Sequence, residues 1–232
     1  VDLSLQVIKA ARPIHWVKNL ALFAALLLTG TLFETGLFKD VLLGFISFSF
    51  ATSATYIFND IIDAKRDRLH PVKKFRPIAS GKLPLLIAVF ELVVFVILSL
   101  NVALYLNQLF FTLILVYLAM QLLYSLGLKN IHVIDILIIA TGFILRVYAG
   151  AFVIDAHLSV WFLLCVVSAS LFLAAGKRRS EINLLEAVDG GTRQSLSKYS
   201  KELLNSYVTM FGNATWMSWS LYTFFESPKA TL

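Results

Sequence analysis

The stretch VLLGFISFSFATSATYIF, residues 41–58, contains no charged side chain and runs directly into NDIIDAKRD, residues 59–67. A helix of about 20 apolar residues crosses the hydrocarbon core of a bilayer. Because that core offers the backbone no hydrogen-bond partners, such a stretch is expected to be helical. An apolar helix that continues without a break into an acidic segment predicts a membrane span with polar chemistry at one end.

The rest of the chain has the same character. Of its 232 residues 59% are hydrophobic and only 15% charged, with a mean hydropathy of +0.80, whereas soluble domains carry about 25% charged residues. The sequence predicts an all-α, polytopic transmembrane bundle forming a single domain over residues 1–232. Residues 1–12 are expected to form an amphipathic helix in the membrane interface. Seven apolar blocks are predicted as spans, at about 16–33, 41–58, 85–106, 109–126, 133–153, 158–175 and 203–225.

The basic residues predict the orientation of these spans. They gather in the N-terminal segment and in the loops at 59–83, 127–132 and 177–202, and an excess of Lys and Arg marks cytoplasmic loops. We therefore expect a multi-pass protein of the plasma (inner) membrane, with active-site loops 59–83 and 177–202 facing the cytosol. The net charge of +6 then reflects topology, and no nucleic-acid partner is expected. The single cysteine, Cys165, is expected to pack within an apolar block.

The acidic segment predicts a metal site. If the helix continues past the membrane, Asp60, Asp63 and Asp67 lie on one face, with Asn59 beside Asp63. Three carboxylates on one stripe repel one another unless a cation lies between them. Hard oxygen donors, without His or Cys at ligand spacing, suit Mg²⁺, which completes its shell with phosphate oxygens and water. The alternative is a solvated acidic helix end, but polar groups that emerge from a span are usually functional.

The segment HPVKKFRPIASG, residues 70–81, predicts a phosphate site beside these carboxylates. Its two prolines end the helix, and Ser80-Gly81 favours a turn. Lys73, Lys74 and Arg76 then follow the acidic face closely. Acids for a metal and bases for phosphate oxygens are the two halves of a diphosphate site. Topological positive charge alone is the alternative, but it does not account for the aspartates.

These residues resemble the UbiA-type intramembrane prenyltransferase family. The pattern NDxxDxxxD at residues 59–67 is similar to that family's first aspartate-rich motif, which implies Mg²⁺ and substrate diphosphate at a cytosolic cap. The family usually has nine spans, more than the seven blocks found here. Its aromatic prenyltransferases carry a second acidic motif at the end of the sixth span, but this chain reads LAAGKRRSE at residues 173–181. A basic site there favours an additional phosphate over a second magnesium ion.

That difference, together with the patterns RPxxWxKN at 12–19, HPxKxxRPIASG at 70–81 and YSxxLK at 124–129, resembles one branch of the family over residues 12–222. The branch transfers 5-phosphoribose from phosphoribosyl diphosphate to a polyprenyl (decaprenyl) phosphate, with release of diphosphate, in synthesis of cell-wall arabinan (arabinogalactan) precursors. The resemblance implies a membrane-bound, magnesium-dependent glycosyltransferase whose partners are these two substrates. The sequence does not determine the oligomeric state, and a homo-oligomer is one possibility.

The lipid phosphate is already an anionic nucleophile, so the protein must mainly position substrates and stabilise the departing charge. The predicted catalytic residues are Asp60, Asp63, Lys73 and Arg76, and the predicted metal ligands are Asn59, Asp60, Asp63 and Asp67. Lys73 and Arg76 are assigned to the diphosphate, and Lys177, Arg178 and Arg179 to the ribose phosphate. The complete set of predicted substrate-binding residues is Lys18, Lys74, Tyr124, Lys129, Arg146, Lys177, Arg178 and Arg179.

Two charged residues fall inside one predicted span. Asp135 and Arg146 are eleven residues apart, which places them near one helix face but about 16 Å apart along the axis, too far to pair. Arg146 is deep, and a charge at that depth faces the bundle interior or a wet cavity. It is expected either to have a structural partner, with Glu91 a candidate, or to lie near the lipid phosphate. His15, His132 and His157 are given no role.

Two other functions are weighed. The first is an aromatic prenyltransferase using a polyprenyl diphosphate donor, which the missing second acidic motif disfavours. The second is a transporter or lipid carrier. Transporters place ionisable residues at the midplane of broken helices, whereas here the charges gather at one mouth.

Overall fold

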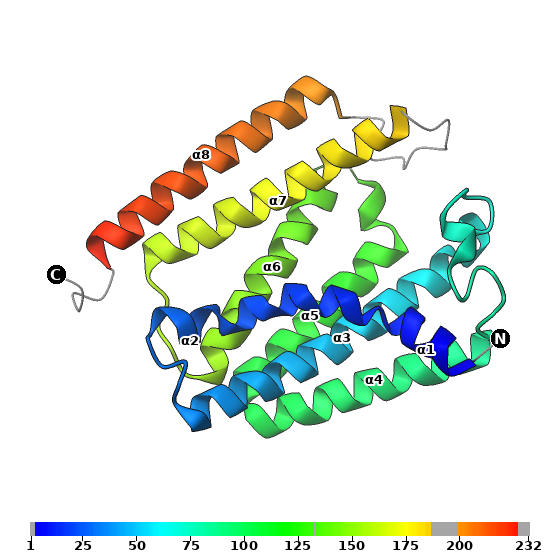
Figure 1. Ribbon diagram of the computed structural model, residues 1–232, viewed down its shortest axis with the longest axis horizontal. Coiled ribbons are helices and arrows are strands. Elements are labelled where there is room, and N and C mark those ends of the chain that lie inside the picture. Colours follow the sequence, from blue (N-terminus) through cyan, green and yellow to red (C-terminus); the bar gives the residue numbers. More distant parts are fainter. Residues whose placement is uncertain (1–2, 132, 187–198, 227–232) are drawn as a thin grey trace. The chain divides into compact units, whose positions relative to one another are not determined.

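The computed structural model describes residues 3–131, 133–186 and 199–226, with side chains to 182 in the second range. All regular secondary structure in this described part is helical, and it contains no strand (Figure 1), as the sequence predicts. The chain divides into two compact units, residues 1–128 with 146–156, and residues 129–145 with 157–232. The interpretation as one membrane domain stays a prediction. His132 and residues 187–198 of the second predicted cytosolic loop lie outside the described residues.

The first unit is built around one long helix. Its elements are α1 (Leu3–Ala11), η1 (Pro13–Phe23), α2 (Ala24–Leu28), α3 (Thr35–Asp67), η2 (Lys73–Phe75), α4 (Leu85–Leu106) and α5 (Gln108–Leu126). The 33 residues of α3 extend about 50 Å, well beyond a hydrocarbon core of about 30 Å. The helix therefore carries its acidic end past the apolar part, and the predicted continuation through Asp67 is confirmed. In Figure 1, α4 returns alongside α3.

Five described helices are long and apolar enough to cross a membrane: α3, α4, α5, α6 (Ile134–Val153) and residues 160–182 of α7 (Val160–Glu186). The predicted block at 16–33 is wrong as one continuous span, because it is divided between the 3₁₀ helix η1 and the short helix α2. Pro13 opens η1, and α2 stops before Gly30, whose φ is +72°. The last predicted block is helical as α8 (Lys201–Phe225), but it is not among the five.

The 3₁₀ helix η1 has one exposed and one buried row of side chains, each with a spacing of three residues. With three residues per turn, every third residue shares a ridge. Ile14, Val17 and Leu20 form an apolar ridge that is 53% to 80% exposed, whereas Asn19 and Leu22 are fully buried. An exposed apolar ridge of this kind suits contact with lipid.

Two contacts fasten η1 inside the first unit. Trp16 donates a hydrogen bond from Nε1 to Ser53 Oγ on α3 at 2.9 Å. At the other end, a Cβ on Gly150 of α6 would lie 1.8 Å from the carbonyl oxygen of Leu22. Only glycine allows this approach, which brings the inner ridge of η1 onto the last turns of α6.

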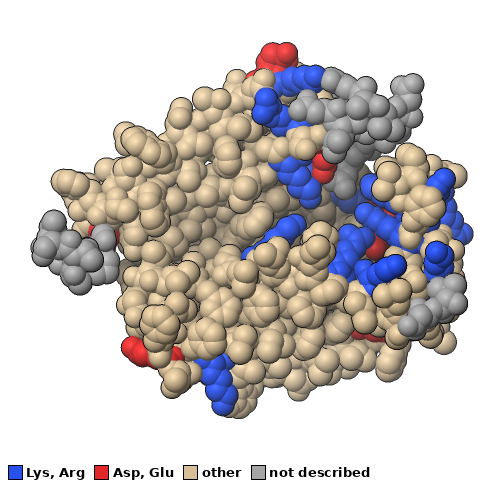
Figure 2. Space-filling model, in the orientation of Figure 1, with Lys and Arg blue, Asp and Glu red and all other residues tan. Residues whose placement is uncertain are grey.

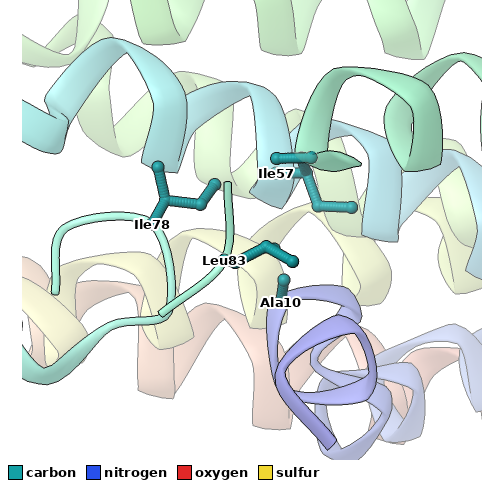
Figure 3. Packing of buried hydrophobic residues seen from close by; sticks show 5 residues of the cluster. Ala10, Ile57, Ile78 and Leu83 are labelled. Atoms are coloured by element: carbon teal, nitrogen blue, oxygen red, sulfur yellow. The ribbon is translucent and has the colours of Figure 1, made fainter. Parts of the chain in front are cut away.

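A small apolar cluster holds the segment after α3 in place. Figure 3 shows Ile78 and Leu83 of this segment directed toward Ile57 of α3 and Ala10 of α1. All four are at most 6% exposed. Burial of this cluster packs the loop against α3 and α1, because each isoleucine or leucine side chain removed from water stabilises the packed arrangement by about 1.5–3 kcal/mol.

The second unit begins at Lys129 within η3 (Leu128–Asn130) and contains the first part of α6 and the helices α7 and α8. Helices α7 and α8 lie side by side (Figure 1). Its core is formed by Ile136, Ala140, Ala174, Tyr199 and Leu204. Cys165 is buried and its thiol lies 3.8 Å from the carbonyl oxygen of Thr215. The prediction that this cysteine packs within the apolar part is confirmed.

Candidate active site

The acidic end of α3 presents its three aspartates on one side, as the spacing predicts. Asp60, Asp63 and Asp67 are 2%, 8% and 2% exposed, and Asn59 precedes them on the same helix. Carboxylates are almost never buried to this extent without partners. Each of these buried carboxylates therefore needs neighbouring groups that compensate its negative charge.

Arginines supply the compensation. Arg12 Nη2 donates to both carboxylate oxygens of Asp60, at 2.7 and 2.6 Å. Arg76 Nη1 lies between two aspartates, 3.0 Å from Asp60 Oδ1 and 2.7 Å from Asp67 Oδ2. Arg66, one turn along the helix, donates to Asp63 Oδ1 at 2.9 Å. We call Arg12, Asp60, Asp63, Asp67 and Arg76 the α3-end cluster.

Backbone hydrogen bonds within the loop after α3 hold the part of it that carries Arg76. The N–H of Ser80 donates to the carbonyl of Arg76 at 2.9 Å, and the N–H of Leu83 donates to Pro77 at 3.0 Å. Gly81 takes a φ of +75°, which glycine adopts without strain. The predicted turn at Ser80-Gly81 is confirmed, and with the apolar cluster of Figure 3 it turns Arg76 back over the aspartates.

The side chain of His70 accepts backbone hydrogen bonds at the start of this loop. Its Nδ1 accepts hydrogen bonds from the backbone N–H groups of Val72 and Lys73, at 3.2 and 3.3 Å. Burial and the positive charge of Lys73 lower the pKa of His70 below its usual value. The neutral ring is the form that can accept these bonds. Of the two predicted phosphate-binding lysines, Lys73 is half-buried and Lys74 exposed.

Figure 2 shows how charge is distributed over α3 and its loop. Basic side chains gather over the end of α3 and the loop that follows, whereas few lie over the start of α3. The gathering agrees with the sequence, in which the segment 65–82 is rich in Lys and Arg. A surface of this kind attracts polyanions such as diphosphates.

Arg12 is the member of the cluster whose place in the site the sequence did not reveal. It precedes Pro13 yet has a φ of +51° and a ψ of +55°, a left-handed conformation that is disfavoured for a non-glycine residue before proline. Its guanidinium lies 5.1 Å from the ring centroid of Tyr56. Strained residues persist where the surroundings fix them and often belong to functional sites. In the sequence Arg12 was visible only as the first residue of the pattern RPxxWxKN, which did not place it beside the aspartates.

Arg146 lies deep in the first unit within a polar network. Its Nε donates to Asn19 Oδ1 at 2.7 Å, and Nη2 lies 3.3 Å from the hydroxyl of Tyr117. The guanidinium also stands 5.0 Å from the ring centroid of Phe48. The suggested partner Glu91 is wrong, because neither of its carboxylate oxygens receives a hydrogen bond from a described residue. Lys18, on η1 beside Asn19, is half-buried, as is Tyr124 at the end of α5.

The predicted basic cluster of the second unit divides into two kinds of residue. Lys177 and Arg179 are exposed, whereas Arg178 between them is fully buried. Arg178 Nε lies 3.1 Å from Asp135 Oδ2 on α6, and Nη1 pairs with Glu181. Lys129 on η3 is also buried, at 3% exposure. The sequence assigned all three residues at 177–179 to one phosphate and could not separate them.

The donor set at the end of α3 fits a hard cation, although its aspartates do not surround one point. In the part of the chain that the structure describes, no group of three His, Cys, Asp or Glu side chains is gathered closely enough to hold a metal ion. The carboxylates of Asp60 and Asp67 instead meet at Arg76. Carboxylate oxygens are nevertheless the type of ligand that Mg²⁺ prefers, and the ion usually takes only one or two protein carboxylates.

Comparison with known proteins gives the class. Residues 20–179 match the model of the UbiA prenyltransferase family, and the chain belongs to that family. The predicted resemblance to this family, drawn from the motif at 59–67, is thereby confirmed.

Within the family, the chain is similar to curated enzymes of one activity. It is 40% identical over 228 residues to the decaprenyl-phosphate phosphoribosyltransferase of Corynebacterium glutamicum, covering 97% of this chain and 69% of the relative. It is 38% identical over 222 residues to the decaprenyl-phosphate phosphoribosyltransferase of Mycobacterium tuberculosis, covering 94% and 74%. The sequence-based choice of this branch agrees with both relatives.

Solved structures support the fold. A UbiA homologue from Archaeoglobus fulgidus bound to GPP and Mg²⁺ superposes with a TM-score of 0.79 at 19% identity, covering 97% of this chain and 80% of that one. The same homologue bound to DMAPP and Mg²⁺ gives the same score at 18% identity. The predicted all-α, multi-pass membrane fold is confirmed, and these structural relatives bind Mg²⁺.

Proposed function

We propose that this chain transfers 5-phosphoribose from phosphoribosyl diphosphate to a decaprenyl or similar polyprenyl phosphate, with release of diphosphate. The activity of the curated relatives, at 38–40% identity over nearly the whole chain, supports the proposal. Its single strongest structural support is the α3-end cluster, in which Arg12 and Arg76 pair with buried aspartates. Guanidinium groups placed this way can exchange carboxylate oxygens for the oxygens of a diphosphate.

The reaction needs one bond made and one broken. A phosphate oxygen of the lipid bonds to C1 of the ribose, and the bond from C1 to the diphosphate breaks. The lipid phosphate is already ionised, so no side chain has to remove a proton from it. The protein acts by holding both substrates and by stabilising the charge that develops on the leaving diphosphate.

We assign Mg²⁺ to the end of α3. Asn59, Asp60, Asp63 and Asp67 are the residues that would hold it. When bound, the ion supplies positive charge to the diphosphate oxygens. The carboxylate oxygens that three aspartates bring to one end of α3, and the Mg²⁺ bound by the structural relatives, support the assignment.

The basic residues are divided among three phosphate groups. Arg12, Lys73, Lys74 and Arg76 are assigned to the diphosphate, because they lie on or beside the α3-end cluster. Lys177 and Arg179 are assigned to the 5-phosphate of the ribose. Lys18, Tyr124 and Lys129 are kept as candidates for contact with a substrate phosphate, and Arg146 as a candidate for the lipid phosphate. We assign the α3-end cluster to the cytosolic side on the distribution of Lys and Arg.

Labelled substrates test the proposal. Membranes from cells expressing the chain are incubated with phosphoribosyl diphosphate labelled in the ribose, decaprenyl phosphate and Mg²⁺, and the lipid fraction is counted. Label in the lipid, lost on chelation, is the expected result. A parallel reaction receives a polyprenyl diphosphate and an aromatic acceptor. Prenylation there without labelled lipid in the first reaction would replace the proposal with the aromatic prenyltransferase.

A further inference from the structure

The second unit contains a buried polar cluster that the proposed reaction does not use as a reactant. Asp135 of α6 and Arg178 of α7 are fully buried, and Tyr199, just before α8, is 7% exposed. Buried polar networks are retained where their bonds fix a particular arrangement. We call Asp135, Arg178 and Tyr199 the α6–α7 clamp.

The tyrosine hydroxyl joins two parts of this clamp. It donates to Asp135 Oδ1 at 2.9 Å and accepts the backbone N–H of Val133 at 2.8 Å. Val133 has a φ of +67°. A β-branched residue in the left-handed region is a genuine outlier, and it persists only where the surroundings hold it. The hydrogen bond from Val133 to Tyr199 is such a restraint.

The other oxygen of Asp135 fixes α7. It lies 3.1 Å from Arg178 Nε, and Arg178 pairs in addition with Glu181. Successive side chains leave a helix about 100° apart. Holding Arg178 inward therefore sets the directions of Lys177 and Arg179 on either side of it, both exposed.

We infer that Tyr199 and Asp135 are positioning residues that act through Arg178 and through the left-handed turn at Val133. The inference rests on the proposed function, since the groups they place are the substrate-binding candidates Lys177, Arg179 and, shortly before the turn, Lys129. On this view Arg178 holds the site together and does not bind the ribose phosphate itself.

Hydrogen–deuterium exchange tests the turn independently of catalysis. In Tyr199→Phe the amides of the peptide 133–137 are expected to exchange about tenfold faster than in the wild type. Adding Val133→Gly should restore activity to Tyr199→Phe, because glycine adopts a positive φ without help. Val133→Thr, which keeps the β-branch, should not rescue it. Tyr207→Phe on α8 is the matched tyrosine control. Unchanged exchange in Tyr199→Phe, or equal rescue by threonine and glycine, would overturn the inference.

Kinetics distinguish a positioning role from general stabilisation. Tyr199→Phe is expected to raise KM for phosphoribosyl diphosphate about tenfold with kcat little changed, because the phosphate-binding residues are displaced while the α3-end cluster is intact. A parallel loss of kcat and of thermal stability, with KM unchanged, would show a purely structural tyrosine. If the wild type transfers no phosphoribose, the proposed function fails, and the exchange measurement still decides whether the clamp holds the turn.

Discussion

The α3-end cluster and the α6–α7 clamp both pair aspartates with arginines, yet they differ in what water can reach. At the end of α3 the side chains of Arg12 and Arg76 are 19% and 25% exposed. In the clamp the side chains of Arg178 and Asp135 are both 0% exposed. An ion pair with one accessible partner can exchange that partner for a ligand. A sealed pair cannot, because breaking it leaves a buried charge.

This difference in exposure separates basic residues that can bind a ligand from basic residues that stabilise the fold. Arg76 and Arg178 look equivalent in the sequence, since each lies in a basic stretch that follows a predicted span. From the difference in burial we propose that Arg76 binds substrate and that Arg178 stabilises the fold. Four experiments test the roles given to these two clusters and to the loop beside the first of them.

Asp63→Asn should have the largest effect, a fall in phosphoribosyl transfer of about 1,000-fold with the protein still folded. The amide keeps the shape but loses the charge that a cation requires. The measurement is labelled lipid formed per milligram of protein at saturating Mg²⁺. Asp40→Asn, near the other end of α3, is the control and should retain activity. Equal activity in both variants would remove the end of α3 from the chemistry.

Arg178→Ala should destabilise the protein by about 3 kcal/mol, since it removes one partner of a buried ion pair. Arg76→Ala should destabilise it less, because its pairs are partly exposed. Thermal inactivation of the two purified variants measures the difference. If Arg76→Ala proves the less stable of the two, the distinction between a sealed and an exchangeable pair is wrong.

Arg179→Gln should raise KM for phosphoribosyl diphosphate by about tenfold without a change in thermal stability, because an exposed residue loses only its contact with a phosphate. Lys201→Gln, also exposed on the second unit, serves as the control. Steady-state kinetics at varied phosphoribosyl diphosphate give the answer. A KM equal to that of the control variant would contradict the assignment of Arg179 to the ribose phosphate.

The smallest expected effect concerns His70 and pH. Because its pKa is lowered in the folded loop, the unfolded loop binds more protons. The stability that the neutral ring contributes is therefore present at neutral pH and is lost as the pH falls below the ordinary histidine value of about 6.5. Limited proteolysis of residues 70–83 over a pH series should show protection falling in the wild type. His70→Gln, which does not titrate, should abolish that pH dependence; a persistent dependence would point to another group.

Much of the site could be predicted from the sequence because its chemistry is local. The aspartates at 60, 63 and 67 lie on one continuous helix, so their spacing alone placed them on a common face. The loop at 70–81 follows within a few residues, and its prolines and Ser80-Gly81 predicted the turn. Arg12 and Tyr199 could not be found this way, because each contacts a residue more than 45 positions away.

The amino-acid pattern alone was enough to predict the class of the protein. Long apolar blocks require helices in a bilayer, and the spacing of three aspartates and the basic segments beside them point to a metal and phosphates. The folded structure was needed to show which charges face water and how η1 divides the first apolar block. It also showed that Arg178 is buried against Asp135 whereas Arg76 is partly exposed. The physical reason is that burial depends on every element packed around a residue, whereas periodicity depends only on its own helix.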